Sequence, residues 1–221
     1  MLLTTAVICV LLAAYSRAAM CPEYGISDGL RMIFLDGHNK YRSEIAKGLW
    51  NGVKTKDGEI YAPKAARMRK MVYDCELEQK AKKFADDCNH DIDEAVKYGA
   101  NTLSKYGASV NFSPDAKLAT RMWFTGSRMQ GPGKNLTFSE QKYPQHTTAF
   151  TQMIWQDTYK VGCYIKSCVD RKNTAVVCMY SPVGNILGQK IYEEGEPCKV
   201  DADCKCEGCT CSKEEALCVV H

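Results

Sequence analysis

Apolar residues recur with a helical period early in the chain and with a strand period late in it. Between Ser27 and Lys47, apolar side chains return every three or four residues, at Leu30, Ile33, Phe34, Tyr41 and Ile45. Ser27 and Asp28 suit the start of a helix, and Gly48 suits its end. The pattern therefore predicts a long amphipathic helix over residues 27–47.

Two further helices are predicted downstream. Residues 74–88 place an apolar stripe on one helical face, made of Leu77, Ala81, Phe84, Ala85 and Cys88. On the outer surface, Glu76 is spaced to pair with Lys80, and Glu78 with Lys82. A third helix is predicted to start at Ser113-Pro114-Asp115, with Ser113 as its N-cap, and to run towards Phe124.

The period changes in the last third of the chain. Residues 161–165 and 175–180 are short β-branched and aromatic runs separated by a polar loop, so they predict two paired strands. Cys168 and Cys178 flank that loop and are one candidate pair for a disulfide across the hairpin. Helices followed by strands predict an α+β fold, with helices packed on an antiparallel sheet.

The composition narrows the class of protein mainly by exclusion. Of 221 residues, 45% are hydrophobic and 25% are charged, which excludes a disordered or collagen-like chain. A formal net charge of +3, from 29 basic and 26 acidic residues, is too balanced to suggest a nucleic-acid partner. After the first twenty positions there is no run of about 18 apolar residues, so no transmembrane segment is predicted.

The start of the chain predicts export. The apolar run from Leu2 to Tyr15 is short for a membrane span, and Ser16-Arg17-Ala18 suits cleavage by signal peptidase after Ala18. A buried N-terminal helix is the alternative interpretation, but nothing in the sequence caps such a helix. We therefore expect residues 1–18 to be a signal peptide and the mature protein to be secreted and extracellular.

The cysteines agree with an oxidising compartment. The chain has 13 cysteines, and removal of Cys9 with the signal peptide leaves twelve, an even number that predicts six disulfides. The cysteines expected to be oxidised are Cys21, Cys75, Cys88, Cys163, Cys168, Cys178, Cys198, Cys204, Cys206, Cys209, Cys211 and Cys218. The last six are crowded into a segment too short to bury a core, so disulfides must hold it. Cys206 and Cys209 have the spacing of a zinc or redox motif, but in this compartment we expect them to be disulfide-bonded.

Two sequons point to the same compartment. Asn111-Phe112-Ser113 and Asn135-Leu136-Thr137 predict N-glycosylation of Asn111 and Asn135. Pro114 directly follows the first sequon, which favours Asn135 as the modified residue.

Several separated motifs then resemble the CAP superfamily. Residues 150–155, Phe-Thr-Gln-Met-Ile-Trp, followed by Val-Gly-Cys-Tyr at 161–164, are similar to its signature. Residues 38–42, His-Asn-Lys-Tyr-Arg, are similar to its His-Asn-x-x-Arg element, and residues 62–68, 180–185 and 191–198 also fit. The match covers about residues 21–218 and resembles the single-domain activation-associated or Ancylostoma-secreted proteins of parasitic nematodes.

The resemblance implies an α-β-α sandwich in residues 19–197 and a short disulfide-rich C-terminal hinge in residues 198–221. It also implies a cleft where two His and two Glu can bind zinc, since imidazole and carboxylate are zinc ligands. At the four corresponding positions this chain has Ile92, Ala100, Gly126 and Ala149. Their side chains offer no lone pair to a metal, so we expect no catalytic residues, no metal and no cofactor.

Displaced histidines are the alternative source of ligands. His90, with Asp93 and Glu94 nearby, and His146 could rebuild a metal site only if several groups converged within about 2 to 2.2 Å of one ion. Such a site also needs hydrogen bonds that orient its ligands. We expect His90 and His146 to be surface histidines and His38 to be a packing residue of the first helix.

Three functions remain open at this point. The resemblance implies a secreted, non-enzymatic effector that binds a host protein receptor, because hookworm relatives include antagonists of integrins on platelets and neutrophils. The chain contains no Arg-Gly-Asp or Lys-Gly-Asp motif, so an integrin contact would use another surface. A lipid or sterol carrier is the second function and needs a concave apolar site. A metal-dependent hydrolase comes last because its ligands are replaced, and the basic cluster at residues 67–70 is typical of a solvated turn.

Overall fold

The computed structural model describes residues 19–21, 25–55, 58–88, 99–126, 131–132, 135–139 and 145–221, without the side chains of residues 51–61 and 145–146. The predicted signal peptide, His90 and Ile92 lie outside the described residues. Among the described residues, no helix is both long and apolar enough to cross a membrane.

A mixed sheet of four strands forms the middle of the molecule. Its order is β3 (Val72–Tyr73), β5 (Lys160–Cys168), β6 (Asn173–Ser181) and β4 (Ala100–Tyr106). β3 runs parallel to β5, whereas β5 with β6 and β6 with β4 are antiparallel. The two predicted strands lie inside β5 and β6 and are confirmed, and the edge strand β4 was not predicted.

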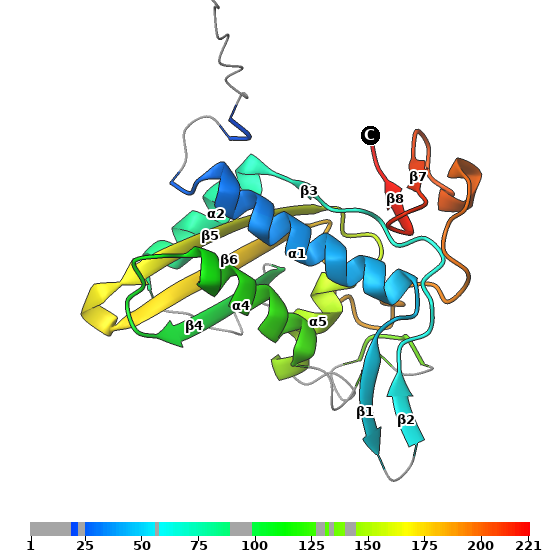
Figure 1. Cartoon of the computed structure of the whole chain (residues 1–221), viewed down its shortest axis with the longest axis horizontal. Coiled ribbons are helices and arrows are strands. Elements are labelled where there is room, and N and C mark those ends of the chain that lie inside the picture. The colour runs from blue at the N-terminus through cyan, green and yellow to red at the C-terminus, as the bar shows by residue number, and fades with distance from the viewer. Residues whose placement is uncertain are drawn as a thin grey trace, which may run out of the picture.

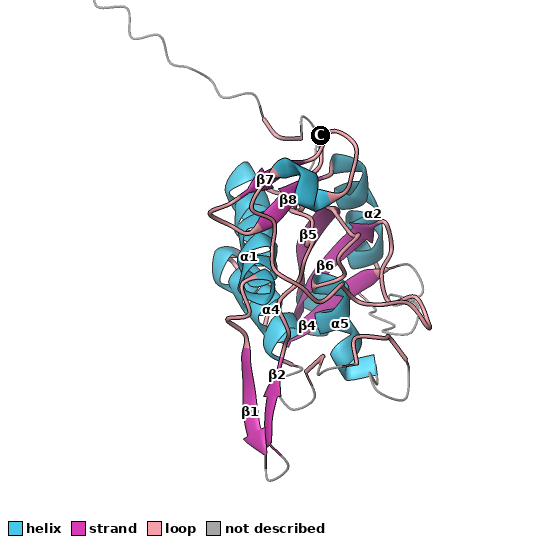
Figure 2. Cartoon of the chain, turned by 90° about the vertical axis from the view of Figure 1, so that its right-hand side faces the viewer, coloured by secondary structure: helices cyan, strands magenta, loops and turns pink. Residues whose placement is uncertain are grey.

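Helices cover both faces of this sheet. α2 (Cys75–Asp86) packs on one face, and α1 (Asp28–Ala46), α4 (Ser113–Thr125) and α5 (Gln145–Met153) lie on the other, as Figures 1 and 2 show. Side chains alternate along β6, so that Val176 and Cys178 join the core under α1 and α4 while Val177 and Met179 join the core under α2. The predicted α+β class and α-β-α sandwich are confirmed.

Smaller elements extend from the ends of the sandwich. The hairpin of β1 (Asn51–Thr55) and β2 (Gly58–Tyr61) projects away from the sheet (Figure 1). The 3-10 turn η1 (Val169–Arg171) joins β5 to β6. The hinge contains η2 (Asp201–Cys204) and an antiparallel pair, β7 (Thr210–Ser212) with β8 (Leu217–Val219).

The helix starts follow from local capping. The Ser27 hydroxyl oxygen accepts the Leu30 N–H at 3.3 Å, as its predicted position at the start of α1 requires. Ser113 is not the N-cap of α4, which corrects the prediction, because it is the first helical residue and Phe112 precedes it. The Asn111 carbonyl oxygen instead accepts the Ser113 N–H at 3.1 Å.

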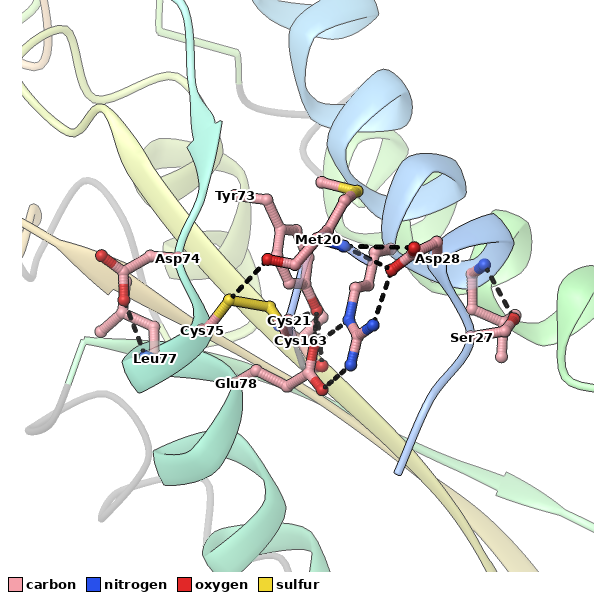
Figure 3. A network of polar contacts seen from close by, with 12 residues as sticks. Met20, Cys21, Ser27, Asp28, Tyr73, Asp74, Cys75, Leu77, Glu78 and Cys163 are labelled. Atoms are coloured by element: carbon pink, nitrogen blue, oxygen red, sulfur yellow. Dashed lines mark hydrogen bonds and ion pairs between the residues drawn. A yellow bond between two sulfur atoms is a disulfide. The ribbon is translucent and has the colours of Figure 1, made fainter. Parts of the chain in front are cut away.

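Glu78 does not lie on the outer surface of α2, which contradicts the predicted pair with Lys82. Its side chain is fully buried, and Arg31 of α1 donates two hydrogen bonds to its carboxylate, both at 2.7 Å (Figure 3). Tyr73 donates a third at 2.6 Å, and Arg31 also bonds Asp28 at 2.7 Å. Burial and the Glu78 carboxylate raise the pKa of Tyr73, so the phenol stays protonated. Lys82 pairs with Asp86 one turn further on.

The twelve cysteines form six disulfides. The pairs are Cys21–Cys75, Cys88–Cys168, Cys163–Cys178, Cys198–Cys211, Cys204–Cys218 and Cys206–Cys209. The candidate pair of Cys168 with Cys178 is wrong, and strand register is the reason. In the β5–β6 pair, Cys178 stands opposite Cys163, and Cys168 stands opposite Asn173. Cys178 is therefore five residues along β6 from the position that faces Cys168. Five residues of strand span roughly 17 Å, far beyond the reach of a disulfide.

Arg42 ties α1 to the chain that follows α5. Its guanidinium is fully buried and donates to the backbone carbonyls of Arg69, Met153, Trp155, Gln156 and Thr158 at 2.8 to 3.1 Å. Burial lowers the pKa of Arg42 to about 9, so the group keeps its charge at neutral pH. A charged donor therefore satisfies the carbonyls of Met153 and Thr158 and adds a second hydrogen bond to those of Trp155 and Gln156.

The hinge packs against the sandwich. The Cys218 N–H donates to Met68 O at 2.8 Å, and Lys70 N–H donates to Cys218 O at 2.7 Å. Ser43 of α1 donates to the Glu215 carbonyl at 2.6 Å, and Lys70 pairs with the Glu215 carboxylate at 2.5 Å. The contacts fix the hinge on α1 and on residues 68–70.

Candidate functional site

Three of the four positions at which the resemblance implies metal ligands lie among the described residues, each on a different element. Gly126 caps the C-terminus of α4, Ala100 begins β4, and Ala149 lies in α5. The Trp123 ring N–H donates to Thr102 O at 3.0 Å and ties α4 to β4. The Asn101 amide donates to Ala149 O at 3.0 Å and ties β4 to α5. Hydrogen bonds thus connect the three elements that carry these positions. The Ala100 side chain, however, packs in the core under α2, whereas Ala149 packs against the core under α1 and α4, and none of the three residues offers a ligand atom.

A buried polar chain lies beneath these positions. The Asn101 amide also donates to the Tyr180 hydroxyl at 2.9 Å, and that hydroxyl lies 2.8 Å from His38 Nε2. His38 Nδ1 lies 2.7 Å from Phe34 O, which can only accept, so Nδ1 carries the proton and Nε2 accepts from Tyr180. Burial lowers the pKa of His38 to about 4 and raises that of Tyr180, so both stay neutral.

This chain of hydrogen bonds uses both nitrogens of His38. Its side chain is fully buried, as expected of a packing residue, and its one lone pair accepts from Tyr180. His38 therefore cannot turn to a metal at the surface without breaking two buried hydrogen bonds. Its hydrogen bond to the Tyr180 hydroxyl connects α1 to β6.

The residues present do not fit the zinc site that the family resemblance implies. Methyl groups and a glycine stand at the three described positions, and zinc needs nitrogen, sulfur or oxygen ligands. Among the described residues, Cys198, Cys204 and Cys218 alone bring three ligand atoms together, and all three are in disulfides. His90 lies outside the described residues, as does the side chain of His146, whose backbone belongs to α5.

A rigid loop stands beside the replaced positions and exposes aliphatic side chains. Residues 182–187 follow β6, and α5 binds this loop through one backbone N–H and one side chain. Gln152 accepts the Gly184 N–H at 3.0 Å, and the Asn185 amide donates to Thr148 O at 2.9 Å. Val183 lies over Gly99, because a β-carbon on that glycine would stand 2.7 Å from the valine side chain.

The apolar surface of this loop is made of three residues. Val183, Ile186 and Leu187 are 43%, 42% and 59% exposed. Scattered aliphatic residues on a surface are ordinary, but three on one braced loop form a preorganised apolar contact surface. Residues 180–185 stand out in the sequence only through the family resemblance, and no sequence pattern predicts this surface.

A concave feature lies between α1 and α4. It is a groove of about 960 Å³ whose walls include Ile33, Tyr41, Pro114 and Leu118. Asp115 and Lys105 also line the groove, and their ion pair is 2.6 Å long. Asp115 is 3% exposed, and within the described residues its second carboxylate oxygen has no hydrogen-bond partner. The groove therefore combines apolar walls with one buried acceptor.

The basic cluster at residues 67–70 does not form a free positive surface. Arg67 pairs with Glu193, Arg69 with Asp157 and Lys70 with Glu215. Met68 between them is buried. These charges serve to attach neighbouring segments, which goes beyond the solvated turn expected from the sequence.

Both sequon asparagines are exposed and sit in the same local geometry. Asn111 accepts the Ser113 N–H at 3.1 Å, and Asn135 accepts the Thr137 N–H at 3.0 Å. Leu136 and Phe138, next to Asn135, pair with Ile191 and Gln189 beyond the apolar loop. A glycan on Asn135 would therefore stand close to residues 186–191.

The architecture and this site define a class of protein: a disulfide-stabilised α-β-α sandwich with a short cysteine-rich extension. The sequence profile of CAP, the Cysteine-rich secretory protein family, matches residues 35–180. The chain belongs to the CAP family.

Its relatives include nematode proteins. Ancylostoma secreted protein of Ancylostoma caninum is 36% identical over 205 residues, which cover 90% of this chain and 46% of that protein. The chain thus spans about half the length of that relative. Hookworm platelet inhibitor 1 of Ancylostoma caninum is 30% identical over 198 residues, covering 89% of this chain and 85% of that protein.

Solved structures show the same fold. NaASP2, crystallised with Zn²⁺, has a TM-score of 0.75 and 37% identity over 90% of this chain and 99% of that one. Hookworm Platelet Inhibitor has a TM-score of 0.69 and 28% identity over 91% of this chain and 96% of that one. Zinc in the NaASP2 crystal belongs to that protein, whereas Ala100, Gly126 and Ala149 here supply no ligand.

Proposed function

We propose that this protein is an exported, non-enzymatic effector that binds a host protein receptor, such as an integrin on platelets or neutrophils. The observation that carries the proposal is the loss of ligand side chains at Ala100, Gly126 and Ala149, beside a loop held rigidly with apolar residues outward. Similarity to a protein named for platelet inhibition supports a host-cell target.

The loop of residues 182–187 is the contact surface that we assign to this function. α5 already anchors this loop at the Gly184 N–H and the Asn185 side chain, which lowers the ordering entropy that binding costs. Aliphatic anchors on a rigid frame are suited to a desolvated pocket on the partner. The six disulfides keep this frame intact outside the cell.

The proposal is tested by binding labelled protein to platelets and neutrophils and by aggregation and adhesion assays. Leu187→Asp and Ile186→Asp should weaken binding at least about tenfold, since a buried charge at an interface anchor is costly. Val169→Asp, at a residue 71% exposed between β5 and β6, is the matched control and should leave binding unchanged. Equal binding by all variants would remove the loop from the site, and no binding by the wild type would refute the function.

A lipid or sterol carrier is the second candidate, favoured by the groove between α1 and α4. Its apolar walls suit a hydrocarbon body, and the free oxygen of Asp115 suits a single hydroxyl group. Native mass spectrometry of the purified protein should then show a bound lipid. Ile33→Trp, in the groove wall, should abolish that mass, whereas Met32→Trp, exposed beside it, should preserve it. Retention of the same bound lipid by both variants would exclude the groove as the lipid site.

A further inference from the structure

The Cys206–Cys209 disulfide closes the shortest ring in the described chain. Its sequence separation is 3, against 13 to 80 for the other five bonds. It spans the turn Cys206-Glu207-Gly208-Cys209, where Gly208 takes the left-handed conformation with φ of 68°. The bond joins no two secondary-structure elements, so it cannot hold distant parts of the fold together.

The hinge is held without this bond. Cys198–Cys211 and Cys204–Cys218 close loops of 13 and 14 residues, and β7 pairs with β8. The hinge also bonds Met68 and Lys70 through Cys218, and Ser43 through Glu215. A disulfide stabilises mainly by closing a long loop of the unfolded chain, so a bond over three residues contributes least.

The two cysteines of this bond differ in exposure. Cys206 is half-buried, whereas Cys209 is 7% exposed. Glu207 and Gly208 between them are exposed, as is Lys205 on the other side of Cys206. Cys206 is therefore the more accessible of the two residues to a thiolate from solvent, and Cys209 is the leaving sulfur.

We propose that Cys206–Cys209 is a thiol–disulfide exchange site that oxidises exposed dithiols. The partner thiolate attacks the Cys206 sulfur, the bond to Cys209 breaks, and its electron pair leaves on the Cys209 sulfur, which takes a proton. The partner's second thiolate then attacks the mixed disulfide and releases Cys206. The partner loses two electrons and two protons as it becomes a disulfide, and Cys206 and Cys209 gain them. This activity does not rest on the proposed receptor binding.

Graded reduction tests the first step. The oxidised protein is equilibrated with rising dithiothreitol, trapped with iodoacetamide and mapped by peptide mass spectrometry. Cys206 and Cys209 should be alkylated at reductant concentrations at least about tenfold below those that open any other bond. Opening of Cys198–Cys211 or Cys204–Cys218 first, or together with it, would overturn the proposal.

Two single variants test the assigned direction of attack. Cys209→Ser leaves the half-buried Cys206 thiol, and Cys206→Ser leaves the buried Cys209 thiol as the matched control. Cys209→Ser should react with Ellman's reagent at least about tenfold faster. Equal rates, or the reverse order, would contradict attack at Cys206.

The double variant Cys206→Ser/Cys209→Ser separates exchange from folding. It should keep the other five disulfides and a wild-type melting temperature, and it should no longer oxidise a reduced peptide containing Cys-x-x-Cys. Mispaired cysteines or a lost hinge would show that the bond is structural. Undiminished peptide oxidation would place the exchange at another disulfide.

Discussion

Replacing Arg42 by Met should be one of the most damaging single changes away from the disulfides. The variant removes five hydrogen bonds from a charged donor to backbone carbonyls. Trp155 O and Gln156 O keep second donors, the N–H groups of Thr158 and Arg69, but the carbonyls of Met153 and Thr158 depend on Arg42.

Two opposing magnitudes decide the size of the effect. Each hydrogen bond to a charged group contributes about 1.5 to 3 kcal/mol, so the five together exceed roughly 7 kcal/mol. Removing the charged group recovers the cost of burying it. That cost, which lowers the pKa of Arg42 to about 9, is on the order of 5 kcal/mol. With partial relaxation around the methionine, we expect a net loss of about 3 to 5 kcal/mol.

The assay is equilibrium unfolding in urea, with disulfides intact, followed by circular dichroism. Arg42→Lys is the companion variant and should lose less, because an ammonium keeps the charge and three of the five donors. A loss below about 1 kcal/mol for Arg42→Met would refute the reasoning, since it would mean that the carbonyls find other partners at little cost.

Four further outcomes are expected. Because the folded pKa of His38 is about 4, below its unfolded value, the unfolding free energy should fall by about 3 kcal/mol as pH drops from 6.5 to 4, and His38→Gln should flatten that slope in urea titrations at each pH. Gly162→Ala should lose about 3 kcal/mol by the same assay, because its β-carbon would stand 2.2 Å from Glu78 N, while Gly29→Ala should lose nothing, because the nearest atom to its β-carbon would be Ser27 Oγ at 3.8 Å. Micromolar zinc or EDTA should leave the melting temperature unchanged, whereas a ligand at 100 times its Kd would add about 2.7 kcal/mol. Denatured, unreduced protein should show no free thiol with Ellman's reagent, and a stable thiol signal would contradict full pairing.

The sequence predicted those elements whose signals are local. Periodic apolar residues and nearby caps marked α1 and α2, and β-branched runs marked β5 and β6. Helix α5 was not predicted because polar residues are buried in it beside Phe150 and Met153, so it shows no simple apolar stripe: Thr148 and Gln152 bind the loop of residues 182–187, more than 30 residues away. No local pattern contains that partner.

Errors at individual residues have the same origin. Glu78 has a lysine one turn away, so helical spacing placed it at the surface, but Arg31 of α1 pairs with it in the core. Cys178 is close to Cys168 in sequence, yet strand register sets it opposite Cys163. The replaced ligand positions were found by comparison with family motifs, whereas the apolar loop beside them needed the fold.

The central claim is that this protein acts on host cells by binding through a surface without metal. The most direct measurement is a dose–response in platelet aggregation and neutrophil adhesion, using protein stripped with EDTA and then freed of the chelator. We expect the stripped protein to inhibit at the same concentration as the untreated protein. Inhibition that disappears on stripping and returns with zinc, or no inhibition by either preparation, would contradict it.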